Sequence, residues 1–288
     1  MPTFSAARGD ASFRDAFGVE IMYSTWRAGK PRGLVQIAHG VGEHGLRYEP
    51  LAQDLVQAGF TVYVNDHRGH GRTGMAQWDG DRSKLGRLGP GGLRAAIAAV
   101  RQMTRVAQEE EPGLPVVLLG HSWGSLMAQK IVNEDSGAYA GIVLSGSAYR
   151  LPGWMNSGDL NKRHAALGPT RFEWLTRDRS IIDAMAVDPL AVEAKVVELF
   201  GIADTLRLLG VPRRGVQHDV PMLLQVGSDD PLGGPRSIER LARAYRERAG
   251  LSDVAVRVYQ DARHEIYNEL NRDEVIADLV AWLNRIVS

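Results

Sequence analysis

Short apolar runs alternate with longer stretches of helical apolar spacing along most of this chain. The runs are bounded by glycine, proline or polar residues, and they predict buried strands at 33–38, 60–64, 115–119, 140–145, 220–226 and 254–259. The helical spacing predicts helices at 48–58, 90–108, 125–132, 235–249 and 272–287. Residues 12–17 and 19–26, on either side of Gly18, predict a short hairpin. Apolar strands that alternate with helices are typical of a mostly parallel sheet covered on both faces, so we predict an α/β fold.

This rhythm is interrupted between Ala148 and Asp219. The stretch is rich in Arg, Asp, Trp, Pro and Gly, and its only helix-like pieces are short ones such as 191–200 and 202–209. No strand is predicted within it. We therefore predict one core domain made of residues 1–147 and 220–288, with 148–219 inserted above the sheet as a helical cap.

The composition narrows the classes of partner. The 288 residues are 44% hydrophobic and 24% charged, as in ordinary globular proteins, and their net charge of zero gives no field that attracts nucleic acid. There is no cysteine, which excludes disulfides, thiolate nucleophiles and cysteine metal sites. No apolar run is long enough for a membrane span, and the first ten residues do not resemble a signal peptide, so we expect a cytoplasmic protein.

The pentapeptide Gly120-His121-Ser122-Trp123-Gly124 has the pattern G-x-S-x-G and lies between a predicted strand and a predicted helix. A sharp strand-to-helix turn holds its central residue in strained backbone angles, and small residues on either side let strand and helix approach. The hydroxyl of Ser122 is then exposed at the turn, which predicts a nucleophile.

A serine nucleophile needs a base and a group that orients the base, and both follow later strands. His264 follows the strand at 254–259, and Asp229 and Asp230 follow the strand at 220–226. The carboxyl ends of parallel strands meet in one crevice, and the order Ser, Asp, His is that of α/β-hydrolases. The spacing from Gly227 favours Asp230 as the acid, with Asp229 as the alternative.

Two backbone N–H groups are expected to bind the oxyanion that develops on the substrate. One is the N–H of Trp123, which follows the nucleophile. The other comes from the glycine-rich loop after the strand at 33–38, where Gly40 and Gly42 allow close approach to a ligand and Val41 is the predicted donor.

Five segments in this order closely resemble the monoglyceride lipase and lysophospholipase group of α/β-hydrolases: 39–44 with Arg47-Tyr48, 65–72, 120–124, 227–230 and 263–265. The resemblance implies a serine hydrolase with a cap over an apolar acyl pocket and no metal or organic cofactor. It implies monoacylglycerol or a similar single-chain ester as substrate. It also implies that Gly40, Glu43 and Arg47 belong to the substrate-binding part of the site, the last two near the polar end that holds glycerol.

The chain departs from this group beside the nucleophile. Trp123 stands where these lipases usually have methionine, and Ser125 where they usually have glycine. A bulky indole there would narrow the pocket or favour aromatic acyl groups. A general carboxylesterase acting on short-chain or aromatic esters is therefore the alternative function.

The predicted cap matches no motif. Its arginines leave open either an acidic or polar ester substrate or an ordinary solvated surface: Arg150, Arg163, Arg171, Arg177 and Arg179. Trp154, Phe172 and Trp174 are candidate pocket or core aromatics. Loose contact of an apolar cap with a membrane surface, and the oligomeric state, also stay open.

Other classes fit less well. His67 and His70 beside Asp66 offer possible metal ligands, but Arg68 between the histidines argues against a metal. Serine at the turn argues against dehalogenases and epoxide hydrolases. An aminopeptidase needs a site for a free amine, which the sequence does not reveal, and a non-catalytic ligand-binding protein would be favoured by a broken triad.

Overall fold

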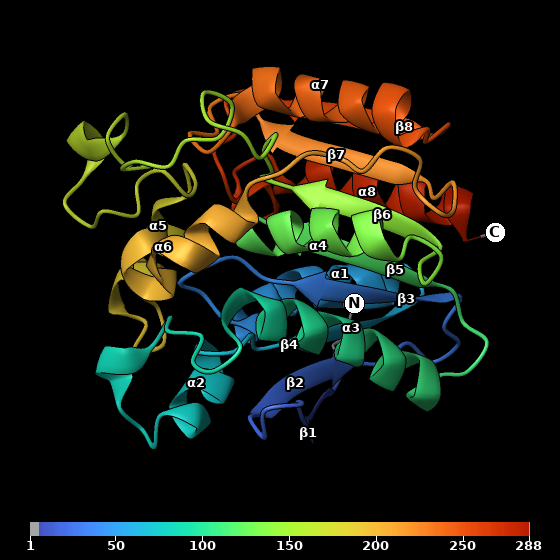
Figure 1. The fold of residues 1–288 in the computed structure, drawn as a ribbon, viewed down its shortest axis with the longest axis horizontal. Helices are drawn as coiled ribbons and strands as arrows, with labels where there is room; N and C mark the ends of the chain where they lie inside the picture. Colours follow the sequence, from blue (N-terminus) through green and yellow to red (C-terminus); the bar gives the residue numbers. More distant parts are fainter. Residues whose placement is uncertain (1–5, 288) are drawn as a thin grey trace, which may run out of the picture.

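The six apolar runs and the predicted hairpin form one mixed sheet of eight strands in a computed structural model, which describes residues 6–287 (Figure 1). The first strand of the hairpin lies at 8–14 rather than at the predicted 12–17. The strand order is β1-β2-β4-β3-β5-β6-β7-β8. β2 pairs antiparallel with β1 and β4, and the other neighbouring pairs are parallel. The strands are β1 (Arg8–Arg14), β2 (Glu20–Trp26), β3 (Gly33–Ala38), β4 (Phe60–Asn65), β5 (Val116–His121), β6 (Gly141–Ser145), β7 (Met222–Gly227) and β8 (Val254–Tyr259).

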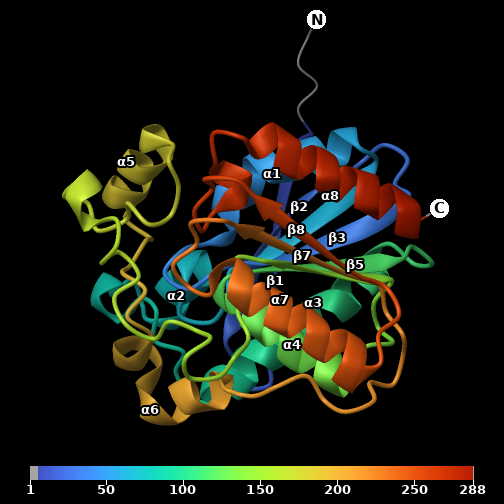
Figure 2. The same cartoon turned by 90° about the horizontal axis from the view of Figure 1, so that it is seen from above.

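Helices cover both faces of this sheet, as predicted. α1 and α8 lie on one face, and α3, α4 and α7 lie on the other (Figure 2). The helices of these two layers are α1 (Glu49–Gln57), α3 (Gly92–Glu110), α4 (Trp123–Glu134), α7 (Gly234–Ala244), which continues as the π-helix η4 (Tyr245–Ala249), and α8 (Arg272–Ile286). Each face has its own apolar core. On β5, for example, Leu118 packs in one core and its neighbours Val117 and Leu119 in the other.

One core helix, α2 (Gly71–Gln77), lies where the sequence analysis predicted no helix. Gly71 and Gly74 are poor helix formers, so the sequence pattern did not predict this helix. Gly74 is needed for packing, because a Cβ there would overlap the carbonyl of Gly69. Three short 3-10 helices also lie outside the inserted stretch: η1 (Gly45–Tyr48), η2 (Arg82–Lys84) and η5 (Ile266–Asn268).

The β6–β7 segment comprises residues 148–219. Its last residues, from Val211, run back along α4 to the start of β7, and Ser136, just after α4, bonds to His218. The earlier residues lie beside the carboxyl ends of the strands (Figure 1). They contain η3 (Ala165–Leu167), α5 (Arg179–Val187) and α6 (Val196–Leu208), and no described residue among them adds a strand to the sheet. α5 was not predicted. Predicted helix 191–200 begins only at Val196, and Gly201, with φ of 77°, breaks α6 where the two predicted pieces were divided. Within residues 6–287, no helix has the length and apolar character that a membrane crossing requires.

The close approach of α4 to β3 predicts a stability effect at Gly124. A Cβ at this position would overlap the carbonyl oxygens of Ala38 and His39, so strand or helix must shift. We expect Gly124→Ala to lower the free energy of unfolding in urea by about 1–3 kcal/mol. Gly29→Ala is the matched control, because no atom lies within 4 Å of a Cβ built there. An equal loss in both variants would contradict this account.

Candidate active site

Ser122 occupies the turn between β5 and α4 in a strained conformation. Its φ of 51° and ψ of −121° lie in a region that side chains other than glycine rarely adopt. The turn is held by the Ser122 N–H, which donates to the carbonyl of Ser145 at 2.9 Å, and by the Ser125 N–H, which donates to the carbonyl of Ser122 at 2.9 Å. The strand, the turn and the helix thus have the arrangement that the G-x-S-x-G pattern predicts.

A pocket with an empty volume of about 300 Å³ opens beside Ser122. The sequence-predicted residues Gly40, Val41, Glu43 and His264 line it together with Ser122. The β6–β7 segment contributes mainly apolar side chains to the opposite wall: Phe172, Trp174, Leu175, Met185, Val192 and Ala194. The pocket therefore has a polar side, formed at the strand ends, and an apolar side.

His264 and Asp230 form a buried pair behind this pocket. His264 Nδ1 lies 3.0 Å from Asp230 Oδ1, which also accepts the N–H of Leu232 at 2.8 Å. Burial lowers the pKa of the imidazole, but the charge of Asp230 and the hydrogen bond to it outweigh burial and raise the pKa of His264 above its ordinary value. The other ring nitrogen, Nε2, is buried and has no hydrogen-bond partner among residues 6–287. It is free to bond a hydroxyl or a substrate.

Asp229, the alternative acid, bonds to residues other than His264. Its carboxylate accepts a hydrogen bond from His164 Nε2 at 2.7 Å and pairs with Arg163, both in the β6–β7 segment. The two adjacent aspartates thus have different partners, and Asp230 is the one beside the imidazole.

The loop after β3 brings backbone N–H groups to the pocket. Gly40 packs so tightly that a Cβ there would lie 3.1 Å from Ser122 Cβ. The Gly40 N–H itself donates to Glu43 Oε1 at 2.5 Å, which leaves the next amide, that of Val41, for a ligand. Trp123 is the first residue of α4, where amides have no acceptor within the helix.

A family model described as Serine aminopeptidase, S33 (Hydrolase_4), matches residues 29–271. The chain belongs to this α/β-hydrolase family. It is 31% identical to a monoacylglycerol lipase of Mycolicibacterium smegmatis, over 97% of this chain and 98% of that protein. It is 29% identical to the monoglyceride lipase of Homo sapiens, over 94% of this chain and 89% of that protein.

Solved structures share the fold of this hydrolase. A thermostable carboxyl esterase from Bacillus coagulans has a TM-score of 0.79 at 24% identity and covers 99% of this chain and 100% of its own. A soluble variant of monoglyceride lipase from Saccharomyces cerevisiae has a TM-score of 0.77 at 18% identity, and the match covers 100% of this chain and 98% of that protein. With the family and the curated relatives, this makes the chain a serine hydrolase of the monoglyceride lipase and esterase group.

In this hydrolase, Glu43 and Arg47 belong to a buried ionic network. Arg47 donates to Glu43 Oε2 at 2.8 Å and, with two nitrogens, to both carboxylate oxygens of Glu265 at 2.7 and 2.9 Å. Tyr48 donates its hydroxyl to Glu43 Oε1 at 2.8 Å. Burial raises the pKa of a carboxyl group, but the charge and hydrogen bonds of Arg47 outweigh it and lower the pKa of Glu265 to about 2.

This network borders a second pocket next to the first, with an empty volume of about 280 Å³. Glu43, Arg47 and Glu265 line it. The sequence analysis assigned no role to Glu265, although it adjoins His264 in a quoted motif. Its partner Arg47 lies 218 positions away in the chain, and no spacing reveals that pair.

The indole of Trp123 does not line the pocket beside Ser122, contrary to the expectation that it narrows this space. It stacks on His70 at 5.2 Å between ring centroids and packs against His67 at 5.3 Å and Phe200 of α6 at 4.8 Å. Its contribution is to the contact between the core and the β6–β7 segment.

The five arginines that the sequence analysis singled out in the β6–β7 segment bind the protein's own groups, and none of the five lines the pocket. Arg150 is buried and donates to Gln129 Oε1 and the Leu208 carbonyl, and the other four pair with carboxylates: Arg163 with Asp229, Arg171 with Glu193, Arg177 with Glu269, and Arg179 with Asp183. They give no support to an acidic substrate.

The three candidate aromatics separate by position. Phe172 and Trp174 line the pocket. Trp154 packs against Tyr149 at 6.1 Å and lies under Arg236, whose guanidinium is 4.6 Å from its ring centroid.

The buried network predicts a large stability effect at Arg47. Arg47→Met leaves the carboxylates of Glu43 and Glu265 buried without their cation, and we expect the free energy of unfolding to fall by about 3–5 kcal/mol at neutral pH. Arg285→Met removes an exposed pair with Asp253 at 2.7 Å and should cost at most about 1 kcal/mol. Urea unfolding of both variants tests this, and similar small losses would show that the network contributes little.

Proposed function

We propose that this hydrolase cleaves carboxylic esters through an acyl-serine, with Ser122 as nucleophile, His264 as base and Asp230 as the residue that orients it. One observation carries the proposal: the imidazole paired with Asp230 lines the same pocket as the strained Ser122. Among residues 6–287 the second nitrogen of this imidazole has no hydrogen-bond partner, as a base that acts on a hydroxyl requires.

In the proposed reaction, Ser122 Oγ attacks the ester carbonyl carbon while its proton passes to His264 Nε2. The carbonyl electron pair moves to oxygen, where the backbone N–H groups of Val41 and Trp123 bind it; one such donor is worth about 3 kcal/mol of barrier. His264 then gives the proton to the departing alkoxide. Water attacks the acyl-serine by the same route, with His264 again as base.

We propose monoacylglycerol or a similar single-chain lipid ester as the substrate. The names of the mycobacterial and human relatives support this, as does the apolar wall of the pocket. Residues 148–219 act in this proposal as the cap that encloses the acyl chain. The polar pocket lined by Glu43 and Arg47 would receive the alcohol portion.

A general carboxylesterase is the second candidate, favoured by the size of the pocket. Its empty volume of about 300 Å³ includes space that is open to solvent, so the enclosed part of the pocket is smaller. Short-chain or aromatic acyl groups fill such a space more readily than long acyl chains.

Turnover of p-nitrophenyl butyrate tests the three roles. We expect Ser122→Ala to lose about 10⁶-fold in kcat and all labelling by a fluorophosphonate probe. Asp230→Asn should lose about 10⁴-fold, because the imidazole is no longer held in the required tautomer. The matched variant Asp229→Asn should keep nearly full activity.

Loss of activity in Asp229→Asn but not in Asp230→Asn would reverse the assignment of the acid. A wild-type protein that binds ligands but is not labelled would be a non-catalytic binder.

A series of monoacylglycerols with increasing acyl length separates the two substrate classes. The lipase proposal expects kcat/KM to rise with chain length through at least the medium chains, because each added methylene in the apolar pocket contributes roughly 0.8 kcal/mol. No turnover of the series, together with rapid hydrolysis of phenyl acetate, would favour the general carboxylesterase.

A further inference from the structure

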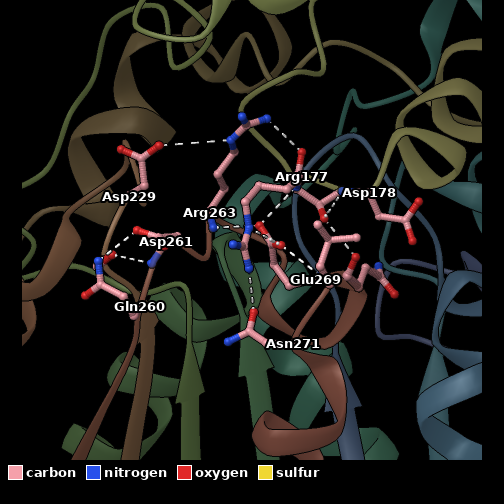
Figure 3. Close-up of polar contacts among 12 residues, drawn as sticks. Arg177, Asp178, Asp229, Gln260, Asp261, Arg263, Glu269 and Asn271 are labelled. Atoms are coloured by element: carbon pink, nitrogen blue, oxygen red, sulfur yellow. Dashed lines mark hydrogen bonds and ion pairs between the residues drawn. The ribbon is translucent and has the colours of Figure 1, made fainter.

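Arg263, which precedes His264, reaches out of the core and binds the backbone of the β6–β7 segment (Figure 3). Its Nη1 donates to the carbonyl oxygens of Glu173 at 2.6 Å and Thr176 at 2.9 Å. One guanidinium therefore fixes the residue before the base to two points of a single short stretch, residues 173–177.

The same stretch holds the residue after the base and covers its ring. The Glu265 N–H donates to the carbonyl of Leu175 at 2.7 Å. The indole of Trp174 packs on the imidazole of His264, with 4.7 Å between centroids and 40° between planes. His264 thus has its neighbours and one face held by residues 173–177, and its Nδ1 held by Asp230.

Glu269 makes a second connection between the loop that carries His264 and residues 173–177 (Figure 3). Its buried carboxylate accepts the Arg263 N–H at 2.8 Å, the Arg177 N–H at 3.0 Å and Arg177 Nε at 2.8 Å. Arg177 also donates to Asn271 Oδ1 at 2.7 Å. A buried carboxylate with this many donors fixes the relative position of its partners.

We propose that residues 173–177 position His264 for proton transfer, with Arg263 and Trp174 as the positioning residues. The inference rests on the proposed role of His264 as base. If so, residues 173–177 of the cap contribute to proton transfer by His264 as well as to the binding of substrate. The Trp174 ring also covers one face of the imidazole, and the π face of an aromatic ring stabilises a cation that lies beside it.

The physical reason is the sensitivity of proton transfer to geometry. A displacement of the base by about 1 Å costs roughly 100-fold in rate even when substrate still binds. Loss of the Arg263 contacts frees the loop without removing any group that lines the pocket. The effect should therefore fall on kcat and leave KM nearly unchanged.

Steady-state kinetics with p-nitrophenyl acetate tests this, because the small acyl group makes little use of the apolar wall. We expect Arg263→Ala to lower kcat by about 10- to 100-fold while KM changes less than about threefold. Arg263→Lys, which keeps one donor for the carbonyls, should recover part of the loss. Arg257→Ala is the matched control, an exposed arginine on β8 whose nearest carboxylate is Asp278 at 3.5 Å.

Wild-type kcat in Arg263→Ala, a change in KM alone, or an equal loss in Arg257→Ala would overturn the inference. If circular dichroism shows that Arg263→Ala does not fold, Trp174→Phe and Trp174→Leu replace it, with kcat expected to be higher in the phenylalanine variant. An inactive wild type that the fluorophosphonate probe does not label would instead refute the proposed function.

Discussion

The buried cation of Arg47 connects the two loops on which the site depends. Through Glu43 it reaches the Gly40 N–H, and so it sets the loop that carries the Val41 amide. Through Glu265 it holds the residue after His264. Both carboxylates are buried, so neither loop can move away without leaving an uncompensated charge in the interior. The two sides of the pocket are thus fixed relative to each other before any substrate arrives.

Much of the core was predictable because six of the eight strands, β3 to β8, are short apolar runs that end in polar or glycine residues. Strand ends of a parallel sheet converge, so the proximity of Ser122 to residues after β7 and β8 follows from order alone. The choice between Asp229 and Asp230 rests on more than spacing. The two aspartates differ in their partners: Asp229 binds Arg163 and His164, which lie more than sixty positions earlier in the chain.

The β6–β7 segment was predictable in outline only. α5 begins at a local signal, Asp178, which accepts the Ser180 N–H, but its short apolar face gave too little periodicity. The contacts that join this segment to the loop of His264 are hydrogen bonds to backbone carbonyls, such as those of Glu173 and Leu175. Every residue has a carbonyl, so such acceptors carry no sequence signature. The side chain of Trp123 was misjudged for a related reason, since its partner Phe200 lies in this segment.

β8 is the last strand of the sheet and pairs only with β7. The loop that follows β8 folds back over the end of β7, where the Asp229 N–H donates to the carbonyl of Ala262 at 2.9 Å. The backbone of Leu175 bonds to the same loop three residues further on, at Glu265. The loop that carries His264 is thus bonded to the core on one side and to the inserted segment on the other, so a change in either part of the chain moves the imidazole.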